Sequence, residues 1–128
     1  MADNVSIQPV LHYRDPEGGL AFLREAFGVE EEAVHRDPDG HVVYVEAALG
    51  DCSFGFGPTS EGGPFDLGPT AIYVAVDEID SRFERAVAAG ADVVMPPTDQ
   101  DYGSRDFAVR DPEANVWCFG TYRPGSPS

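Results

Sequence analysis

The chain has 128 residues, so we expect one domain or two small modules that share a core. Eight Lys and Arg residues stand against 23 Asp and Glu residues, which gives a formal net charge of −15. A field of this sign repels nucleic acids and anionic membrane surfaces, so we expect neither as a partner. The hydrophobic fraction of 42% is ordinary for a globular protein and too high for a disordered acidic chain.

The compartment follows from segments that the sequence lacks. No apolar run approaches the ~20 residues of a membrane-spanning helix, and the first residues form neither a basic nor an apolar signal region. Cys52 and Cys118 lie in separate apolar, strand-like segments, and two thiols do not make a disulfide framework. We therefore expect a cytoplasmic protein with reduced thiols.

The first half of the chain has the pattern of a strand, a helix and three more strands. Residues 6–13 are apolar-rich and end at a turn containing Pro16 and two glycines. Leu20, Leu23 and Phe27 then recur at helical spacing, and a glycine follows where a helix commonly ends. The three strands expected next, in an antiparallel meander, cover residues 30–36, 41–49 and 52–57.

The same order returns after residues 58–69, a Gly- and Pro-rich segment that we interpret as a linker. A strand is expected at residues 70–76, and a helix starts near Ile79. The interval from Asp15 to Gly28 and that from Asp77 to Gly90 are both 13 residues. The last three strands are expected at residues 92–97, 104–111 and 115–122.

This repeat predicts an α+β fold of two βαβββ modules, residues 6–57 and 70–122, with a flexible tail at residues 123–128. One such module cannot bury both faces of its sheet, so the two modules should pair. We expect a curved mixed sheet around a concave cavity, with the helices on the outer face. Function is then expected on the concave face.

Three segments resemble the vicinal oxygen chelate superfamily, which contains glyoxalase I, bleomycin-resistance proteins, extradiol dioxygenases and fosfomycin-resistance enzymes. They are residues 11–28, 73–91 and 110–117. The last contains an Asp-Pro-x-x-Asn turn, in which Ala114 replaces the glycine usual before the Asn. The Tyr-Gly-Ser-Arg stretch at residues 102–105 is similar to one branch of the family. The resemblance spans about residues 6–122 and implies the same fold.

In the metal-dependent members of that family, His, Gln or Glu side chains from the first and last strands of each module hold a divalent cation. The resemblance places these positions at Gln8, Gly55, Ala71 and Cys118. Gly and Ala supply no ligand atom, and a lone thiol is a soft donor without partners. We therefore expect neither a metal nor another cofactor. A shifted metal site of Gln8, Tyr44 and Glu46 stays open.

Strand alternation assigns side chains to the concave face, and Trp117 to the core. Arg105 either clamps a carboxylate or phosphate of a ligand or pairs with one of three nearby acids, Asp99, Asp101 or Asp106. Glu46 is either a general base or a solvated glutamate, and His35 and His41 are expected to be solvated. The expected ligand-binding residues are Gln8, His12, Tyr44, Glu46, Tyr73, Tyr102, Arg105 and Cys118.

These features favour a metal-free binding protein of the bleomycin-resistance type, which sequesters an aromatic or cationic compound such as an antibiotic. The alternative is a metal-dependent or cofactor-free lyase, isomerase or dioxygenase, with Glu46 as its possible catalytic residue. A third interpretation is an interaction domain without a ligand. The resemblance also implies a homodimer, because members of the family commonly complete their sites across a two-fold axis.

Overall fold

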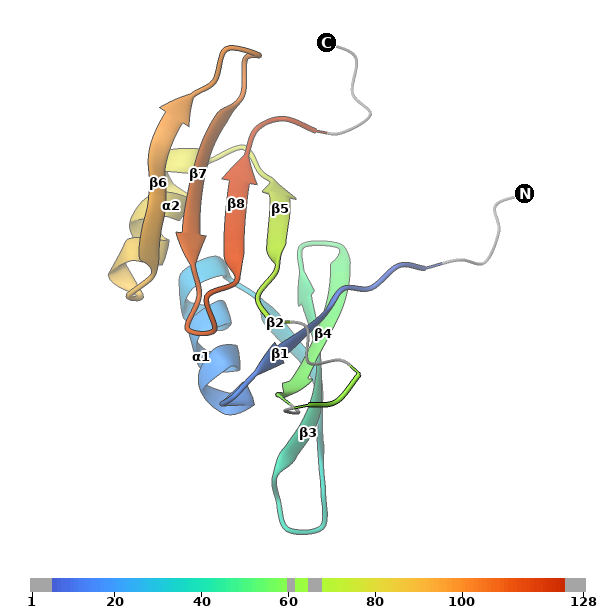
Figure 1. The fold of residues 1–128 in the computed structure, drawn as a ribbon. Helices are drawn as coiled ribbons and strands as arrows, with labels where there is room; N and C mark the ends of the chain where they lie inside the picture. The colour runs from blue at the N-terminus through green and yellow to red at the C-terminus, as the bar shows by residue number, and fades with distance from the viewer. Residues whose placement is uncertain (1–5, 60–61, 65–67, 124–128) are drawn as a thin grey trace, which may run out of the picture.

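A computed structural model describes residues 6–59, 62–64 and 68–123 of the chain, and the α+β class predicted from the repeat is confirmed (Figure 1). Of the expected linker and tail, residues 60–61, 65–67 and 124–128 lie outside the described residues. In chain order the elements are β1 (Val10–Tyr13), α1 (Pro16–Phe27), β2 (Glu30–Arg36), β3 (Val42–Leu49), β4 (Cys52–Pro58), β5 (Ala71–Ala75), α2 (Ile79–Ala88), β6 (Asp92–Asp99), β7 (Arg105–Arg110) and β8 (Val116–Gly120).

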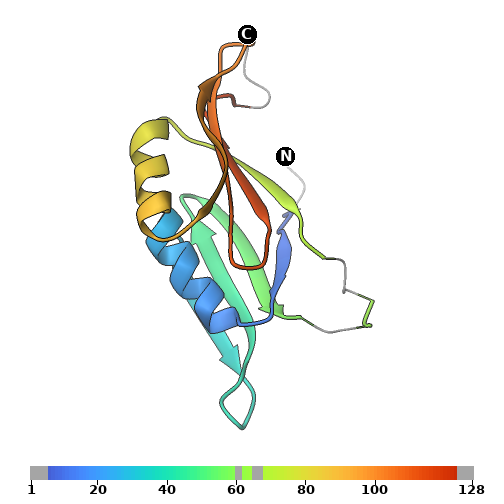
Figure 2. The same ribbon diagram turned by 60° about the vertical axis from the view of Figure 1, so that its left-hand side comes forward.

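The strands form two four-stranded sheets with the same topology, in the orders β1-β4-β3-β2 and β5-β8-β7-β6. In each sheet the first strand runs parallel to the last, and the other pairs are antiparallel, as the predicted meanders require. The eight strands thus form two separate mixed sheets and not one continuous sheet. Both helices lie on one side of the molecule, which leaves the opposite sheet faces uncovered by helices (Figure 2).

Helix α1 begins at Pro16, so residues that we expected in a turn form its first turn. Asp15 caps the helix by accepting a hydrogen bond from the Gly18 backbone N–H at 3.1 Å. Proline is well tolerated at the first helical position, because its missing N–H has no partner there. At the other end Gly28 adopts φ +80°, in the left-handed region that favours glycine.

Every strand except β2 differs from its predicted range, by one or two residues at an end in all but β1. Strand β1 begins at Val10, four residues later than expected. The Pro9 carbonyl before it still accepts from the Gly55 backbone N–H at 2.9 Å, but proline has no N–H with which to continue the pairing. Strand β6 continues through Pro96 and Pro97 to Asp99. Proline removes a backbone donor, but β6 lies at the edge of its sheet, where the outer N–H groups need no partner strand.

A single hydrophobic core joins the two modules. Phe27 at the end of α1 packs against Trp117 and Phe119 of β8, with ring centroids 5.0 and 4.9 Å apart. Phe54 of β4 meets the same Trp117 ring at 5.8 Å. Trp117 is buried, as the sequence predicted, and it contacts aromatic rings of the first module from a strand of the second.

A buried hydrogen-bond network also crosses between the modules. The Tyr13 hydroxyl donates to the Asp111 carboxylate at 2.6 Å, and the Trp117 indole N–H donates to the same carboxylate at 3.0 Å. Burial, followed by the neighbouring Asp111 charge, raises the pKa of Tyr13 well above its usual range. The Asp-Pro-x-x-Asn turn therefore has a structural role, because Asp111 gathers donors from both halves of the chain.

Candidate functional site

The predicted alternation of side chains holds on the central strands of both sheets. On β3, Val45 and Ala47 are buried on the helix side, whereas Tyr44 and Glu46 lie on the opposite face. On the second sheet the buried core residues Phe107, Val109, Trp117 and Phe119 alternate with Asp106, Ala108, Cys118 and Gly120. The sheet faces away from the helices are therefore the candidate binding surfaces.

Three tyrosines, a serine and a buried aspartate form a cluster at one end of the second sheet. We call it the tyrosine cluster, and its members are Tyr73, Tyr102, Tyr122, Ser104 and Asp106. The Tyr102 hydroxyl donates to Asp106 at 3.0 Å, and the Ser104 hydroxyl donates to the other oxygen of that carboxylate. The Tyr73 hydroxyl donates to the Tyr122 carbonyl at 2.7 Å. Tyr102 and Tyr122 meet edge to face, with ring centroids 6.2 Å apart.

Gly120 of β8 gives the cluster its space. A Cβ at this position would overlap the Asp106 carboxylate and would lie 2.5 Å from the Tyr73 hydroxyl. The absent side chain therefore allows a residue of β5 and a residue of β7 to converge above β8, which lies between them. Any residue larger than glycine at this position would push apart the Asp106 carboxylate and the Tyr73 hydroxyl.

Phenols and the thiol near Asp106 are held in their neutral forms. Burial raises the pKa of Tyr73, and the hydrogen bond to Asp106 raises that of Tyr102. Burial also raises the pKa of the Cys118 thiol, which the Asp106 charge reinforces. At neutral pH these groups are hydrogen-bond donors, and Cys118 lacks the thiolate character of a nucleophile.

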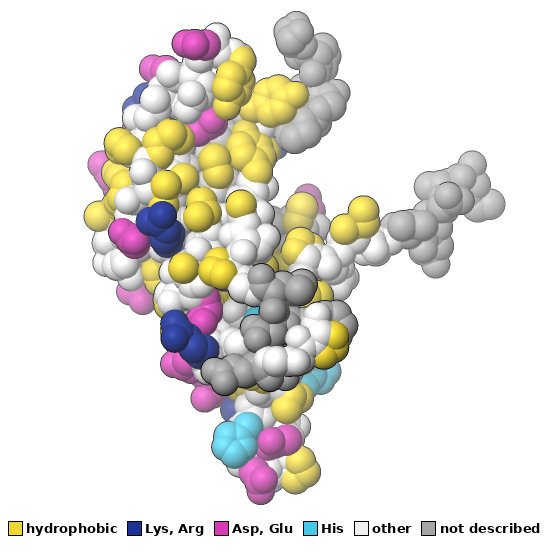
Figure 3. All heavy atoms as spheres, in the orientation of Figure 1, with side chains coloured by type: hydrophobic (Ala, Val, Ile, Leu, Met, Phe, Trp, Pro, Cys, Tyr) yellow, Lys and Arg dark blue, Asp and Glu magenta, His cyan; other side chains and the backbone are white. Residues whose placement is uncertain are grey.

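The face that carries the tyrosine cluster is open in a single chain. The exposed fractions of Tyr73, Tyr102 and Tyr122 are 40%, 68% and 48%. Hydrophobic side chains gather over the second sheet on the face turned to the viewer in Figure 3. A hollow of about 200 Å³ lies elsewhere, between α1 and the strands β2 and β3.

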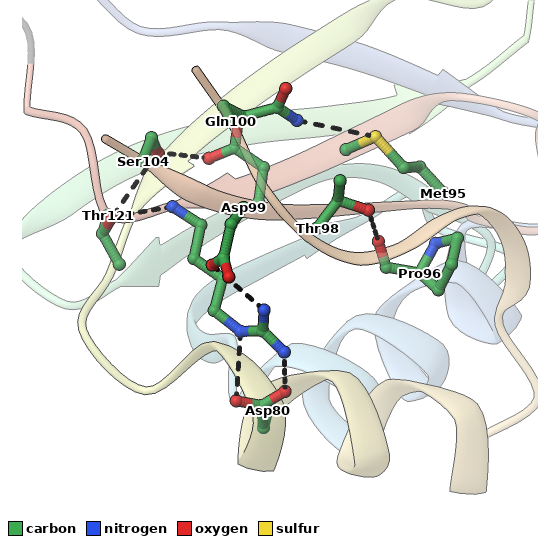
Figure 4. Close-up of polar contacts among 10 residues, drawn as sticks. Asp80, Met95, Pro96, Thr98, Asp99, Gln100, Ser104 and Thr121 are labelled. Carbon is green, nitrogen blue, oxygen red and sulfur yellow. Dashed lines mark hydrogen bonds and ion pairs between the residues drawn. The ribbon is translucent and has the colours of Figure 1, made fainter. Parts of the chain in front are cut away.

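Arg105 points away from the tyrosine cluster. Its guanidinium makes two hydrogen bonds to Asp80 of α2, at 2.8 and 3.3 Å, and one to Asp99 at 3.1 Å. Figure 4 shows Asp80 on its helix and Ser104, the residue before β7, on the other side of the guanidinium. Residues two apart on a strand lie on the same face of the sheet, so Arg105 lies on the helix side with the core residue Phe107. The ion-pair alternative considered for Arg105 is the arrangement observed.

On the first sheet, Tyr44 and Glu46 form a second group with His35. The His35 Nε2 atom lies 2.7 Å from Glu46 Oε2, and both side chains are about half exposed. The Tyr44 ring covers Gly55, where a Cβ would overlap the Tyr44 hydroxyl. We expected His35 to be solvated, and the pairing of β2 with β3 instead brings its half-exposed ring beside Glu46.

The remaining predicted residues do not join these groups. Gln8 is exposed in the segment before β1, and His12 lies half-buried on β1 opposite Gly57. The family's metal positions do not fit a cation, because Gly55 and Ala71 offer no donor atom. Cys118 contributes a thiol without further ligands.

Asp37, Asp39 and His41 bring their side-chain ligand atoms within 4.8 Å of one another at the β2–β3 turn. Backbone N–H groups of Asp39 and His41 donate to one Asp37 oxygen, each at 2.9 Å. The His41 hydrogen bond in particular lowers the pKa of Asp37. The carboxylate therefore has a structural role in the turn.

Sequence reasoning missed Ser104, Tyr122 and His35 as neighbours of the predicted residues, and it considered Asp106 as a partner of Arg105 rather than of Tyr102. Asp106 could have been placed on this face, because it precedes the core residue Phe107 on a strand. The contacts of Tyr122 and Ser104 depend on how the chain turns beyond the ends of β8 and β7, for which no sequence signal was available.

The protein belongs to the Glyoxalase/Bleomycin resistance protein/Dioxygenase superfamily, whose profile matches residues 7–119. "Uncharacterized protein Rv0887c" of Mycobacterium tuberculosis is 30% identical over 135 residues, which cover 94% of this chain and 77% of that protein. "Uncharacterized protein Mb0911c" of Mycobacterium bovis shares the same identity, with 86% of its length covered.

Solved structures show the same fold. TioX from Micromonospora sp. ML1 has a TM-score of 0.77 and 26% identity, over 92% of this chain and 100% of that one. The fosfomycin resistance protein FosX from Mesorhizobium loti has a TM-score of 0.67 and 18% identity, over 97% and 96% of the two chains. Lactoylglutathione lyase from Agrobacterium tumefaciens has a TM-score of 0.69 and 21% identity, over 94% and 95%. These last two likenesses concern the fold alone.

Proposed function

We propose that the protein sequesters a small aromatic or cationic molecule, such as an antibiotic, on the face of the second sheet that carries the tyrosine cluster. The observation that supports this most is the group of three part-exposed tyrosine rings around a buried carboxylate. Tyrosine combines flat apolar area with a polar end, as small-molecule sites require. Membership of a superfamily named after bleomycin-resistance proteins agrees with this proposal.

Binding without a metal is part of the proposal. It is supported by the chemistry of Gly55 and Ala71, which cannot ligate a cation, and by the raised pKa of the Cys118 thiol. Ligand contacts would then come from stacking, apolar packing and a few hydrogen bonds.

We also propose that the chain forms a homodimer in the cytoplasm. Val10 of the edge strand β1 is 51% exposed and Ile7, three residues before it, is 89% exposed, and a second copy would cover such a strand edge. None of the helices among the described residues is long and apolar enough to span a membrane. Light scattering should give twice the 13.8 kDa chain mass, and the monomer mass would contradict the dimer.

One observation favours a second candidate, a cofactor-free lyase or isomerase. The paired side chains of His35 and Glu46 lie near the Tyr44 ring on the first sheet, and Glu46 would be the base. Glu46→Gln should then abolish turnover while it leaves ligand binding at Tyr73 intact. A metal-dependent form of this enzyme predicts stoichiometric metal in the purified protein, removable by a chelator.

Calorimetry against flat aromatic compounds, with and without an amino group, tests the binding function. We expect saturable binding at micromolar concentrations with one site per chain, and at least a tenfold loss in Tyr73→Ala. Val87→Ala is the control, because it removes an exposed apolar side chain from the surface of α2. Absence of binding to every compound, or equal binding by Tyr73→Ala, would contradict the proposed site.

A further inference from the structure

We infer that Asp106 is the counter-charge for a protonated amine, and that the ligand of the tyrosine cluster is an aromatic molecule carrying that amine. This inference rests on the proposed function and specifies which residue selects the charge of the ligand. The sequence interpretation considered Asp106 only as a possible ion-pair partner of Arg105, and not as a ligand-binding residue.

The Asp106 side chain is buried without a cation. The residue is 4% exposed, and no Arg or His nitrogen among the described residues lies within 4.0 Å of its carboxylate. All eight arginines and all three histidines of the chain fall within the described ranges. A buried carboxylate is costly unless it is paired, so the missing cation is expected from outside the chain.

The other buried aspartate among the described residues, Asp111, has hydrogen-bond donors at both of its carboxylate oxygens from several groups. Asp111 accepts from the backbone N–H groups of Glu113 and Asn115 and from the side chains of Tyr13, Asn115 and Trp117. Within the part of the chain that the structure describes, Asp106 accepts only from the hydroxyls of Tyr102 and Ser104. A carboxylate has about four acceptor positions, so Asp106 retains capacity for the N–H groups of a ligand.

The nearest arginine in sequence cannot fill this capacity. Arg105 directs its guanidinium to Asp80 and Asp99 on the helix side of the sheet. Its raised pKa, caused first by the hydrogen bond to Asp80, keeps that arrangement charged. Because Arg105 is already paired with two acids, it does not neutralise Asp106, and the cation for Asp106 would come from a bound ligand.

The surroundings of Asp106 suit a cation attached to a flat ring. Tyr73, Tyr102 and Tyr122 present aromatic faces and edges next to the carboxylate, and ring faces attract cations. The formal charge of −15 raises the local concentration of cations and disfavours anions. A primary or secondary ammonium is preferred to a quaternary one, because only the former donates N–H bonds to Asp106.

Three probes with one ring system and different charges test this inference: 1-naphthylmethylammonium, 1-naphthalenemethanol and 1-naphthoate. Calorimetry on the full chain should rank the cation at least tenfold tighter than the alcohol, with the carboxylate weakest. Asp106→Asn should bring the cation and the alcohol within twofold of each other. Asp101→Asn is the control, since it removes one exposed negative charge from the β6–β7 turn and should keep the wild-type ranking.

Each outcome distinguishes the charge selection from the binding function. Equal affinity for cation and alcohol in the wild type would overturn the role of Asp106 and leave the binding function standing. No binding of any probe at millimolar concentration would overturn both. Circular dichroism checks that Asp106→Asn is folded; if it is not, the wild-type affinity ratio decides, together with nuclear Overhauser contacts between the probe methylene and the Tyr102 and Tyr122 rings.

Discussion

Ala114 has a φ of +66°, which makes it the one non-glycine residue with positive φ in the described part of the chain. It lies in the turn before β8, where its N–H donates to the Asp111 carbonyl at 2.9 Å. The left-handed conformation costs an alanine about 1–2 kcal/mol. The residue that replaces the family's usual glycine is therefore strained within the turn that holds both modules together.

Ala114→Gly should stabilise the protein. Relief of the left-handed strain exceeds the extra flexibility that glycine gives to the unfolded chain, so we expect a gain of about 0.5–1 kcal/mol. Urea unfolding measures the change in the free energy of unfolding. Gly28→Ala is the reverse control, because it places a Cβ at φ +80° and should destabilise. A less stable Ala114→Gly variant would contradict the strain argument.

Tyr13→Phe should lower stability by about 1–3 kcal/mol, because buried Asp111 loses its closest donor. The variant also changes the response to alkaline pH. The pKa of Tyr13 is raised in the folded state, so an unfolded chain releases this proton near pH 10 while the folded chain keeps it. Stability from Tyr13 is therefore complete below pH 10 and is lost as pH rises further.

Urea unfolding from pH 9 to pH 11 measures this loss. The slope that Tyr13 adds approaches about 1.4 kcal/mol per pH unit, and Tyr13→Phe should lack that part of the slope. The other tyrosines with raised pKa values, Tyr73 and Tyr102, remain in the variant and serve as its internal reference. Parallel curves for wild type and variant would contradict the assignment.

At the scale of the elements, α1 and α2 are joined by one arginine. Arg85 of α2 donates to the carbonyls of Glu25 at 2.8 Å and Arg24 at 3.0 Å, which are among the last carbonyls of α1. These carbonyls carry the negative end of the helix dipole, so a cation there is favourable. The Arg24 carbonyl also accepts from the Gly28 backbone N–H at 3.1 Å, so Arg85 adds a second donor there and a donor from the other helix to the Glu25 carbonyl.

Arg85→Ala should cost roughly 1 kcal/mol of stability, a value reduced by the solvent exposure of the side chain. Arg82→Ala is the matched control from the same helix, because no hydrogen bond or ion pair of its side chain is found among the described residues. Thermal unfolding of both variants compares them. Equal losses would show that helix packing, and not this contact, joins the two helices.

The repeat allowed us to predict the helices and strands and the sheet face on which each side chain lies. It did not allow us to predict which side chains from different elements contact one another. Alternation placed Tyr44, Tyr73 and Cys118 on the faces away from the helices, since each strand has a buried and an open side. The partners of Glu46 and Arg105 depend on cross-strand register and on the position of α2, which local patterns do not encode. The start of α1 was missed because a turn-forming sequence and a capped first turn use the same residues.

For the molecule as a whole, salt should increase stability. Among the described residues, five arginines form ion pairs with carboxylates, and these pairs each contribute at most about 1 kcal/mol. The net charge of −15 means that repulsion among the remaining acids exceeds this attraction. Raising NaCl from ~10 mM to ~0.5 M screens both and should raise the free energy of unfolding. A fall in stability would show that the ion pairs outweigh the repulsion.

The placement of Phe27 against Trp117 and Phe119 has a consequence for how the two repeats can unfold. Neither half retains its core if the other opens, because each supplies aromatic rings that the other buries. We expect a single cooperative transition in calorimetry rather than two. A ligand held at the second sheet would therefore protect amide hydrogens of the first sheet from exchange with solvent, although it touches none of them.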